Sequence, residues 1–198
     1  MIAEELLLEF GAEVVTYAKD EVLFEEGKKA HYYFQVKSGE VKMNNFNAQG
    51  KEFIQSIFSY PRSFGEPPLF SDIPYPANAV AVTKAEVFRL KKEVFLKLLL
   101  NYPEVHLSVT RGMAKRLYYK AIMASEISSE DPEHRIITLL DYLKEDVHQL
   151  TEPFSFKVNL TRQQIADLSG LRVETVIRAT KSLEKKNGLI IKNRKLYR

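Results

Sequence analysis

Residues 10–90 alternate between short apolar runs and polar turns. Runs such as VVTY at 14–17 and YYFQV at 32–36 have the length and the β-branched and aromatic content of strands. Gly27, Gly39 and Gly50 stand between such runs, where a tight turn needs a positive φ. Many short strands joined by regular turns predict a β-barrel or β-roll, and this part of the chain shows no helical periodicity.

The pattern becomes helical at KKEVFLKLLL, residues 91–100, which predicts a short helix. Pro103 suits the first turn of a longer helix that runs to about Ser128. An apolar seam along this helix suits either pairing with a second copy of the chain, which we favour, or packing on the chain's own β-rich part. The seam consists of residues three or four positions apart: Val105, Val109, Met113, Leu117, Ala121 and Ala124.

The polar stretch SSEDPEH, residues 128–134, separates the long helix from the last part of the chain. An amphipathic helix is expected over 133–146. We therefore expect three parts: a β-roll domain over 1–102, the long helix over 103–128 and a C-terminal domain over 129–198. This combination belongs to the α+β fold class.

The stretch LTRQQIADLSGLRVETVIR, residues 160–178, contains two helical runs with a break between them. Thr161 is a good N-cap, and Gln164 three residues later completes a capping box. The break Ser-Gly-Leu at 169–171 predicts a turn, after which a second helix runs over about 172–186. Two helices joined by so short a turn are the layout of a helix-turn-helix, whose second helix enters the DNA major groove.

The second helix has an apolar side and a charged side. We expect Val176, Thr180 and Leu183 to face inward, and Glu174, Arg178, Lys181 and Lys185 to face outward. The following segment NGLIIKNRKLYR predicts a hairpin that turns at 192–195, a wing whose Lys and Arg side chains can reach phosphates. The alternative is an ordinary helical hairpin with a solvated basic face.

Charge is placed unevenly along the 198 residues, although the net charge is only +3. Residues 151–198 carry 11 Lys or Arg against 4 Asp or Glu, whereas residues 1–150 carry 18 against 22. A basic end on an acidic body suggests contact with a polyanion, although a solvated charged surface has the same composition.

Several classes of protein are excluded by what the sequence lacks. The chain has no cysteine, which excludes disulfides, cysteine-ligated zinc and cysteine-held iron–sulfur clusters. The N-terminal MIAEELLLEF is acidic and its apolar run is short, so we expect no signal peptide and no membrane span, and a soluble, cytoplasmic protein. The 4 histidines share no ligand spacing, and no nucleophile–base set or phosphate loop is found, so we expect neither a metal site nor an enzyme.

The order of a β-rich domain, a long helix and a winged helix-turn-helix resembles the cyclic-AMP receptor / fumarate-nitrate-reduction regulator (Crp–Fnr) family of bacterial transcription regulators. The resemblance covers nearly the whole chain. The motifs that carry the resemblance are LFEEG at 23–27, SGEVK at 38–42, FGE at 64–66, MAKRL at 113–117 and the helix-turn-helix stretch. The resemblance implies a homodimer through helix 103–128, a jelly-roll-like sensor domain of the cyclic-nucleotide-binding type, and a winged helix-turn-helix that binds double-stranded DNA. It also brings in RNA polymerase as a candidate partner.

Side chains at the start of the family's second helix meet base edges, and the matching positions are Val173, Glu174 and Arg178. Arg pairs with guanine, Glu accepts from the cytosine amino group, and an apolar side chain touches a thymine methyl. We expect a half-site with a thymine next to a G·C pair; Ile177 departs from the small polar residue of the oxygen-regulator branch and leaves the full site open. The expected DNA contacts are Arg172, Val173, Glu174, Thr175, Arg178, Lys181, Thr161, Arg162, Gln163 and Arg194.

The stretch FGEPPLFSDIPYPANAVAV resembles the family's phosphate-binding cassette. Gly65 and Glu66 are present, but the position of the phosphate-binding Arg holds Tyr75, whose neutral hydroxyl cannot replace a guanidinium. On the long helix, Lys120 falls near the positions that meet the purine in cyclic-AMP binders. The candidate effector pocket comprises Gly65, Glu66, Tyr75, Asn78 and Lys120. We expect no cofactor and no cyclic nucleotide, and the effector is unknown.

Two functions remain open. The first is a homodimeric, sequence-specific transcription regulator on an inverted-repeat operator, with a sensor domain that does not bind cyclic AMP. The alternative is a ligand-binding regulatory module that acts through a protein partner, with a DNA-binding head of weak or no sequence specificity. A steep salt dependence of DNA binding separates the first from the second.

Overall fold

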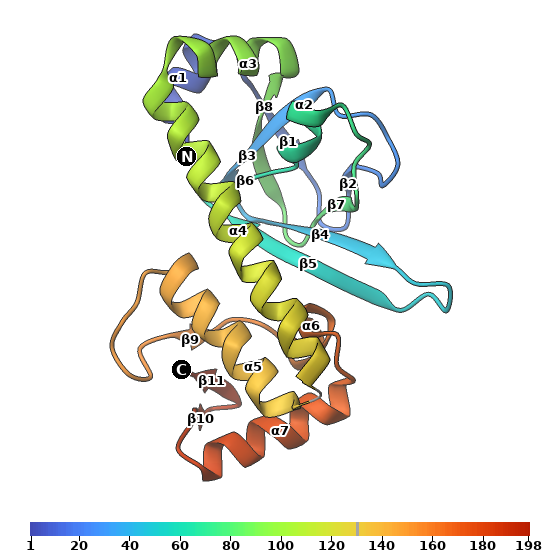
Figure 1. The fold of residues 1–198 in the computed structure, drawn as a ribbon, viewed down its shortest axis with the longest axis vertical. Helices are drawn as coiled ribbons and strands as arrows, with labels where there is room; N and C mark the ends of the chain where they lie inside the picture. Colours follow the sequence, from blue (N-terminus) through green and yellow to red (C-terminus); the bar gives the residue numbers. More distant parts are fainter. Residues whose placement is uncertain (130) are drawn as a thin grey trace. The chain divides into compact units, whose positions relative to one another are not determined.

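A computed structural model describes residues 1–129 and 131–198, which form two compact units, Met1–Ala114 and Lys115–Arg198 (Figure 1). Each unit has its own hydrophobic core. The division between the units falls inside the long helix, whereas the sequence analysis treats that helix as a part of its own. Of the polar joint predicted at 128–134, Glu130 lies outside the described residues.

The described residues of the first unit fold into two antiparallel sheets, with strand orders β1–β8–β3–β6 and β2–β7–β4–β5 (Figure 1). Apolar residues of both sheets contribute to one core, as in a β-roll. The strands are β1 (Glu13–Tyr17), β2 (Val22–Phe24), β3 (Tyr32–Ser38), β4 (Glu40–Phe46), β5 (Glu52–Ser59), β6 (Ser63–Phe64), β7 (Asn78–Ala81) and β8 (Ala85–Lys91). The predicted β-roll is therefore confirmed.

One short helix, α2 (Pro67–Ser71), interrupts the strands of this part. A helix of 5 residues is too short to show periodicity. Prolines occupy its first two positions, where the missing N–H groups have no intrahelical partner to lose. A further short helix, α1 (Glu4–Glu9), precedes the first strand and carries two glutamates in its first turn.

The predicted tight turns are confirmed, because Gly27, Gly39 and Gly50 all have a positive φ. Gly39 is the most constrained of the three. A Cβ atom at this position would lie 2.3 Å from the carbonyl oxygen of Lys84, so the β3–β4 turn requires glycine.

The long helix α4 (Pro103–Ser129) follows α3 (Lys92–Asn101). The apolar seam predicted along α4 is buried in its first half and exposed at Leu117. Val105, Val109 and Met113 pack on the core of the first unit, whereas the side chain of Leu117 is 71% exposed. A step of four residues turns about 40° beyond a full helical turn, so this seam winds around the helix rather than following one side. The prediction of one continuous pairing seam is therefore wrong for its first half.

The second unit contains α5 (Pro132–Asp141), a π-helical segment η1 (Tyr142–Val147), α6 (Arg162–Ser169) and α7 (Val173–Lys185). The helix predicted over 133–146 thus changes to π-helical hydrogen bonding at Tyr142. A sheet with the order β10–β11–β9 completes the unit. Its strands are β9 (Lys157–Val158), β10 (Ile190–Lys192) and β11 (Lys195–Tyr197). No helix in the described parts of the chain is long and apolar enough to cross a bilayer.

Candidate nucleic-acid interface

Local hydrogen bonds fix the two helices α6 and α7 and the turn between them. The Thr161 hydroxyl accepts from the Gln164 backbone N–H at 3.1 Å, and the Gln164 side chain accepts from the Thr161 N–H at 2.8 Å. This confirms the predicted capping box. Gly170 has a φ of +70° and ends α6, and the Leu171 N–H donates to the Ala166 carbonyl at 3.0 Å.

The inner side of this helix-turn-helix is well packed. Val176, Thr180 and Leu183 are buried, as predicted, and the Thr180 hydroxyl donates to the Val176 carbonyl at 2.8 Å. Ser169 was expected in the turn, but it is the last residue of α6, and its buried hydroxyl donates to the Ile165 carbonyl at 2.6 Å. α6 therefore includes the first residue of the predicted break, and Gly170 is its C-cap.

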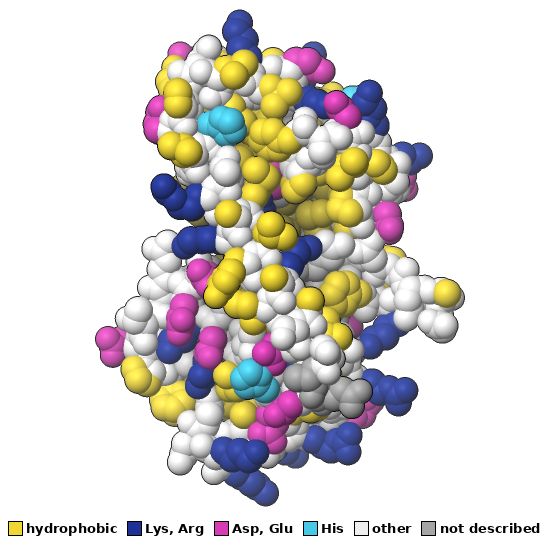
Figure 2. Space-filling model, in the orientation of Figure 1, with side chains coloured by type: hydrophobic (Ala, Val, Ile, Leu, Met, Phe, Trp, Pro, Cys, Tyr) yellow, Lys and Arg dark blue, Asp and Glu magenta, His cyan; other side chains and the backbone are white. Residues whose placement is uncertain are grey.

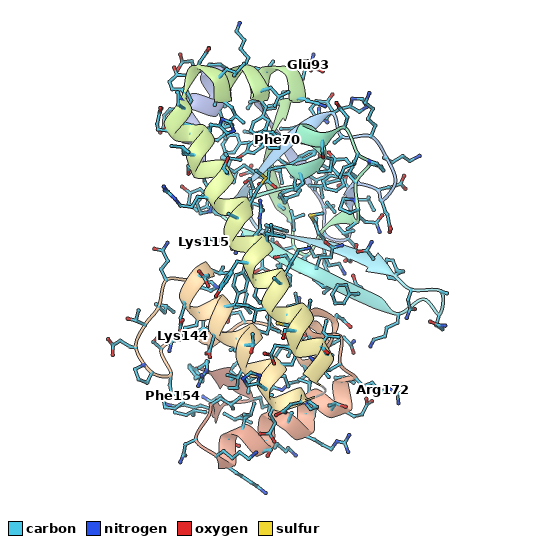
Figure 3. All side chains as sticks on the ribbon, viewed as in Figure 1. Phe70, Glu93, Lys115, Lys144, Phe154 and Arg172 are labelled. Atoms are coloured by element: carbon cyan, nitrogen blue, oxygen red, sulfur yellow. The ribbon has the colours of Figure 1, made fainter. Side chains whose placement is uncertain are left out.

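The outer side of α7 is charged. Glu174, Arg178, Lys181 and Lys185 are all exposed, as predicted. Figure 2 shows Lys and Arg side chains along the lower rim of the second unit, where α7 lies. Arg172, labelled in Figure 3, is exposed and immediately precedes the helix. A positive helix face of this kind suits the negative potential of a DNA groove.

Three of the expected DNA contacts are partly buried or already hydrogen-bonded within the protein. Val173 is partly buried and packs against the core of the second unit. Thr175 is also partly buried. The Gln163 amide donates to the Asp167 carboxylate at 2.9 Å, one helical turn further along α6.

The wing is a tight hairpin whose tip is formed by Asn193 and Arg194. Both residues have a positive φ, which is typical of the two-residue turn that joins twisted antiparallel strands. Lys192 and Lys195 pair across the hairpin, so the predicted turn is confirmed. Strand β9 pairs with the far edge of β11, a strand that the sequence analysis missed because it has only two residues.

The wing is anchored to α5 by Arg198. Its guanidinium donates to both carboxylate oxygens of Asp141, at 2.5 and 2.9 Å, and to the Gly188 carbonyl at 2.8 Å. The hydrogen bond to Asp141 is the main reason why the pKa of Arg198 is raised. This contact holds the hairpin in a fixed place, because a bidentate pair constrains both side chains.

A hollow of about 380 Å³ lies where the start of α6, the middle of α7 and the wing meet. It gathers Thr161, Arg162, Lys181 and Arg194, four of the expected DNA contacts. Among the described residues, its lining contains no acidic side chain; the other lining residues are Leu160, Ile177, Thr180, Ile191 and Lys195. Burial lowers the pKa of the Arg162 guanidinium, because desolvation disfavours its charge. An anion bound in the hollow would attract the Arg162 guanidinium and so offset the cost of burying its charge.

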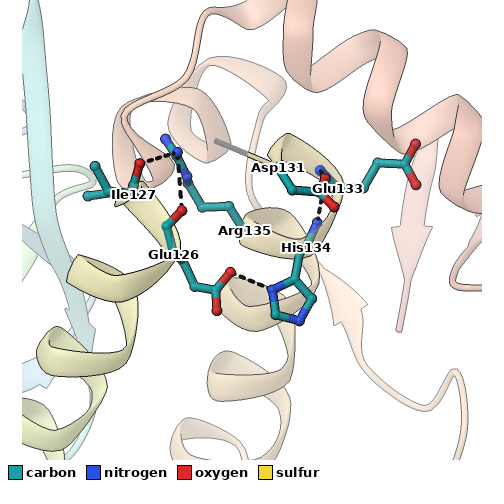
Figure 4. Close-up of polar contacts among 6 residues, drawn as sticks. All are labelled: Glu126, Ile127, Asp131, Glu133, His134 and Arg135. Carbon is teal, nitrogen blue, oxygen red and sulfur yellow. Dashed lines mark hydrogen bonds and ion pairs between the residues drawn. The ribbon is translucent and has the colours of Figure 1, made fainter. Parts of the chain in front are cut away.

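The end of α4 is tied to the helix-turn-helix by Arg135, which is only 7% exposed (Figure 4). Its guanidinium donates to the Glu126 and Ile127 carbonyls at 3.3 and 3.1 Å, and to the Ser169 carbonyl at 3.3 Å. Beside it, the Glu126 carboxylate pairs with His134 Nδ1 at 2.5 Å (Figure 4). Arg135 was not among the residues expected from the sequence, although it lies four residues before Leu139 and therefore on the apolar side of α5.

In the first unit, Tyr75 fills the space beside Gly65. The Tyr75 ring is 4% exposed and stacks on Phe24 with 3.7 Å between the ring centroids. Gly65 has a positive φ, and a Cβ there would lie 3.1 Å from the Phe24 ring and 3.3 Å from the Tyr75 ring. Glu66 is buried and accepts a hydrogen bond from the Ser63 hydroxyl. Gly65, Glu66 and Tyr75 therefore lie together around a packed interior.

The remaining two candidate pocket residues are Asn78 on β7 and Lys120 on α4. The Asn78 side chain accepts from the Glu26 N–H at 2.9 Å and donates to the Asn44 carbonyl at 3.3 Å, so both ends of its amide are used. Lys120 is exposed on α4 and belongs to the other compact unit. An open hollow of about 360 Å³ includes Tyr75 in its lining, together with Lys28, Lys29 and His31, but neither Gly65 nor Glu66. Among the described residues, no group of His, Asp and Glu side chains is arranged to hold a metal ion.

A β-roll followed by a long helix and a winged helix-turn-helix is the architecture of a DNA-binding regulator with an N-terminal sensor domain. Residues 14–102 match the model of the cyclic nucleotide-binding domain, and residues 134–197 match that of the Crp-like helix-turn-helix domain. The chain belongs to the Crp–Fnr family, whose members are transcription regulators.

Relatives and solved structures of this family cover most of the chain. The cAMP-activated global transcriptional regulator CRP of Salmonella typhimurium is 28% identical over 172 residues, which span 86% of this chain and 82% of the relative. The global nitrogen regulator of Nostoc sp. is 24% identical over 188 residues, 92% of this chain and 83% of that protein. The structure of FixK2 from Bradyrhizobium japonicum is similar in fold, with a TM-score of 0.76 at 22% identity over 94% of this chain and 91% of FixK2.

Proposed function

We propose that the protein is a sequence-specific transcription regulator that binds an inverted-repeat operator as a homodimer. The observation that carries this proposal is the cationic hollow between α6, α7 and the wing, whose described lining contains no acidic side chain. The start of α6, the middle of α7 and the wing each bring positive charge to one place beside the exposed side of α7. A phosphate of the DNA backbone is the anion that such a place fits, while α7 lies in the adjacent major groove.

The division of roles follows from exposure and chemistry. Glu174 and Arg178 lie one helical turn apart on the exposed side of α7, where Arg178 pairs with guanine and Glu174 accepts from the cytosine amino group. Arg162 and Arg194 lie in the hollow and bind phosphates, which position the domain without reading sequence. Thr161 supports the same phosphate site from the start of α6, where helix dipoles favour anions.

The homodimer forms through the exposed apolar side chains of α4. Leu117 and Tyr118 are 71% and 70% exposed, and Ala121 is exposed one turn later. Large apolar side chains at this spacing are costly in water and suit a second, identical helix. Two DNA-binding heads related in this way read half-sites about 34 Å apart. We expect RNA polymerase to be the protein that this regulator assists or blocks on a promoter.

The sensor domain does not take up cyclic AMP in our proposal, although relatives named for activation by cAMP match most of the chain. A phosphate needs a cation or several N–H donors. At the corresponding place this chain has the Tyr75 ring, stacked on Phe24 and packed against Gly65. We expect cyclic AMP to change neither the melting temperature nor the affinity for DNA.

The test is selection of operator sequences from random duplexes with the full chain, followed by binding measurements at several salt concentrations. We expect the selected sequences to form an inverted repeat. We also expect the affinity for DNA to fall by roughly a thousandfold between about 50 and 200 mM salt. Equal affinity for selected and random duplexes would favour the alternative function, a module that acts through a protein partner. Sedimentation of the free chain as a monomer at micromolar concentration would remove the homodimer from the proposal.

A further inference from the structure

Ile177 is an apolar side chain on the charged side of α7. It lies three residues after Glu174 and four before Lys181, so the three side chains share one side of the helix. Of the large apolar side chains that the structure describes on α7, Ile177 alone is exposed, with 40% of its surface in contact with solvent. Val173 and Val176, by contrast, pack against the core of the second unit.

Stability does not explain an isoleucine at this position. An exposed side chain gains little from burial, and a β-branched residue forms helix less readily than Ala, Lys or Arg. Single exposed apolar residues are common on proteins, but this one also lines the cationic hollow with Arg162, Lys181 and Arg194. It is therefore surrounded by the groups that bring DNA to α7.

We infer that Ile177 is a specificity-determining residue that reads the 5-methyl group of a thymine in the major groove. The inference rests on the proposed DNA binding and names one base-reading side chain within it. An isoleucine side chain forms no hydrogen bonds, and the thymine methyl is the apolar feature that the major groove offers. Because Ile177 precedes Arg178, the thymine lies next to the G·C pair that Arg178 and Glu174 read.

This assignment changes the role expected of Val173, the apolar residue at the start of α7. Part of the Val173 side chain is already used in packing against the core. Ile177 has no such packing role among the described contacts, and its side chain is free to meet a base. The methyl contact is therefore placed one helical turn further along α7.

The test compares thymine with deoxyuridine, which lacks only the methyl group. In the operator selected by the full chain, each thymine of a half-site is replaced in turn by deoxyuridine and binding is measured. One position is expected to weaken binding roughly threefold per half-site, and about tenfold when both half-sites are changed. Ile177→Ala should bind the thymine and deoxyuridine operators equally, because the group that senses the methyl is gone.

Ile190→Ala is the matched control, since Ile190 is 43% exposed on β10 of the same unit and does not line the hollow. This variant should keep the full preference for thymine. The inference is overturned if wild-type protein binds every deoxyuridine operator as tightly as the thymine operator, or if Ile177→Ala keeps the preference. Failure to select any operator would instead overturn the proposed sequence-specific DNA binding, and the inference with it.

Discussion

Arg135 and Ile127 join two helices: the guanidinium of Arg135 on α5 donates to the Ile127 carbonyl near the end of α4, at 3.1 Å. The carbonyls of a last helical turn have no partners within the helix, and a buried Arg can satisfy several of them at once. A second nitrogen of the same guanidinium reaches the Ser169 carbonyl at the end of α6. One side chain thus links the helix proposed for dimerisation with the first helix of the DNA-binding head.

Arg135→Ala should lower the free energy of unfolding of the second unit by about 2–4 kcal/mol, because three carbonyls lose a charged donor in a buried place. Urea unfolding followed by circular dichroism measures this change. Arg172→Ala is the control, since Arg172 is exposed, and its effect should stay within about 0.5 kcal/mol. Equal effects of the two substitutions would show that the Arg135 hydrogen bonds do not matter for stability.

Arg178→Ala should reduce affinity for the selected operator by about 1–3 kcal/mol and relax the preference at one G·C pair of each half-site. The reason is the loss of a bidentate contact with guanine, which no other base offers in the same geometry. Anisotropy measurements on a set of operators with each base at that pair are the appropriate readout. An unchanged preference for the operator over random DNA would contradict the role of Arg178.

Arg162→Ala should weaken binding to all duplexes by a similar factor, because Arg162 lies in the hollow and meets a phosphate rather than a base. The slope of log affinity against log salt should become shallower by about 1. Arg111→Ala, an exposed arginine of the first unit, should leave the slope unchanged. A loss of affinity confined to the selected operator would instead identify Arg162 as a base-reading residue.

Leu117→Glu should convert the dimer to a monomer without unfolding the chain, since the Leu117 side chain is exposed in a single copy. A carboxylate in an apolar helix pair costs more than the contact it replaces. Sedimentation gives the mass, and circular dichroism reports whether the helices persist. Leu100→Glu is the matched control on α3, where the leucine is also exposed, and this variant should remain dimeric.

Stability of the first unit should decline in alkali because of Tyr75. Burial raises the pKa of the Tyr75 phenol above its ordinary value of 10.0, so the folded protein holds this proton more tightly than the unfolded chain does. The corresponding stabilisation is complete below about pH 10 and is lost as the pH rises above that value. Urea midpoints at about pH 8 and about pH 11 measure the decline.

Tyr75→Phe should make that decline smaller in the first unit. Tyr119→Phe is the matched control, because burial also raises the pKa of Tyr119, which lies in the second unit. An unchanged alkaline decline of the first unit in Tyr75→Phe would mean that the Tyr75 phenol ionises as easily in the folded protein as in the unfolded chain.

Elements that depend on neighbouring residues could be predicted without the fold. The strands of the β-roll follow from short apolar runs between turns, and the capping box at Thr161 needs only the residue three positions later. The exposed side of α7 follows from helical periodicity, which is why Glu174, Arg178 and Lys181 were placed correctly. Local periodicity and local hydrogen bonds act over a few residues, so they can be read without the fold.

Contacts between distant segments settle which side chains pack in a core and which stay exposed. Arg198 donates a hydrogen bond to Asp141, 57 residues earlier, and no local sequence pattern predicts that pair. Helical periodicity does not separate Val173, which packs partly in the core, from Ile177, which is exposed. The first half of the α4 seam likewise packs on the β-roll because of where the sheets lie. Burial depends on contacts between distant segments, and these exist only once the chain has folded.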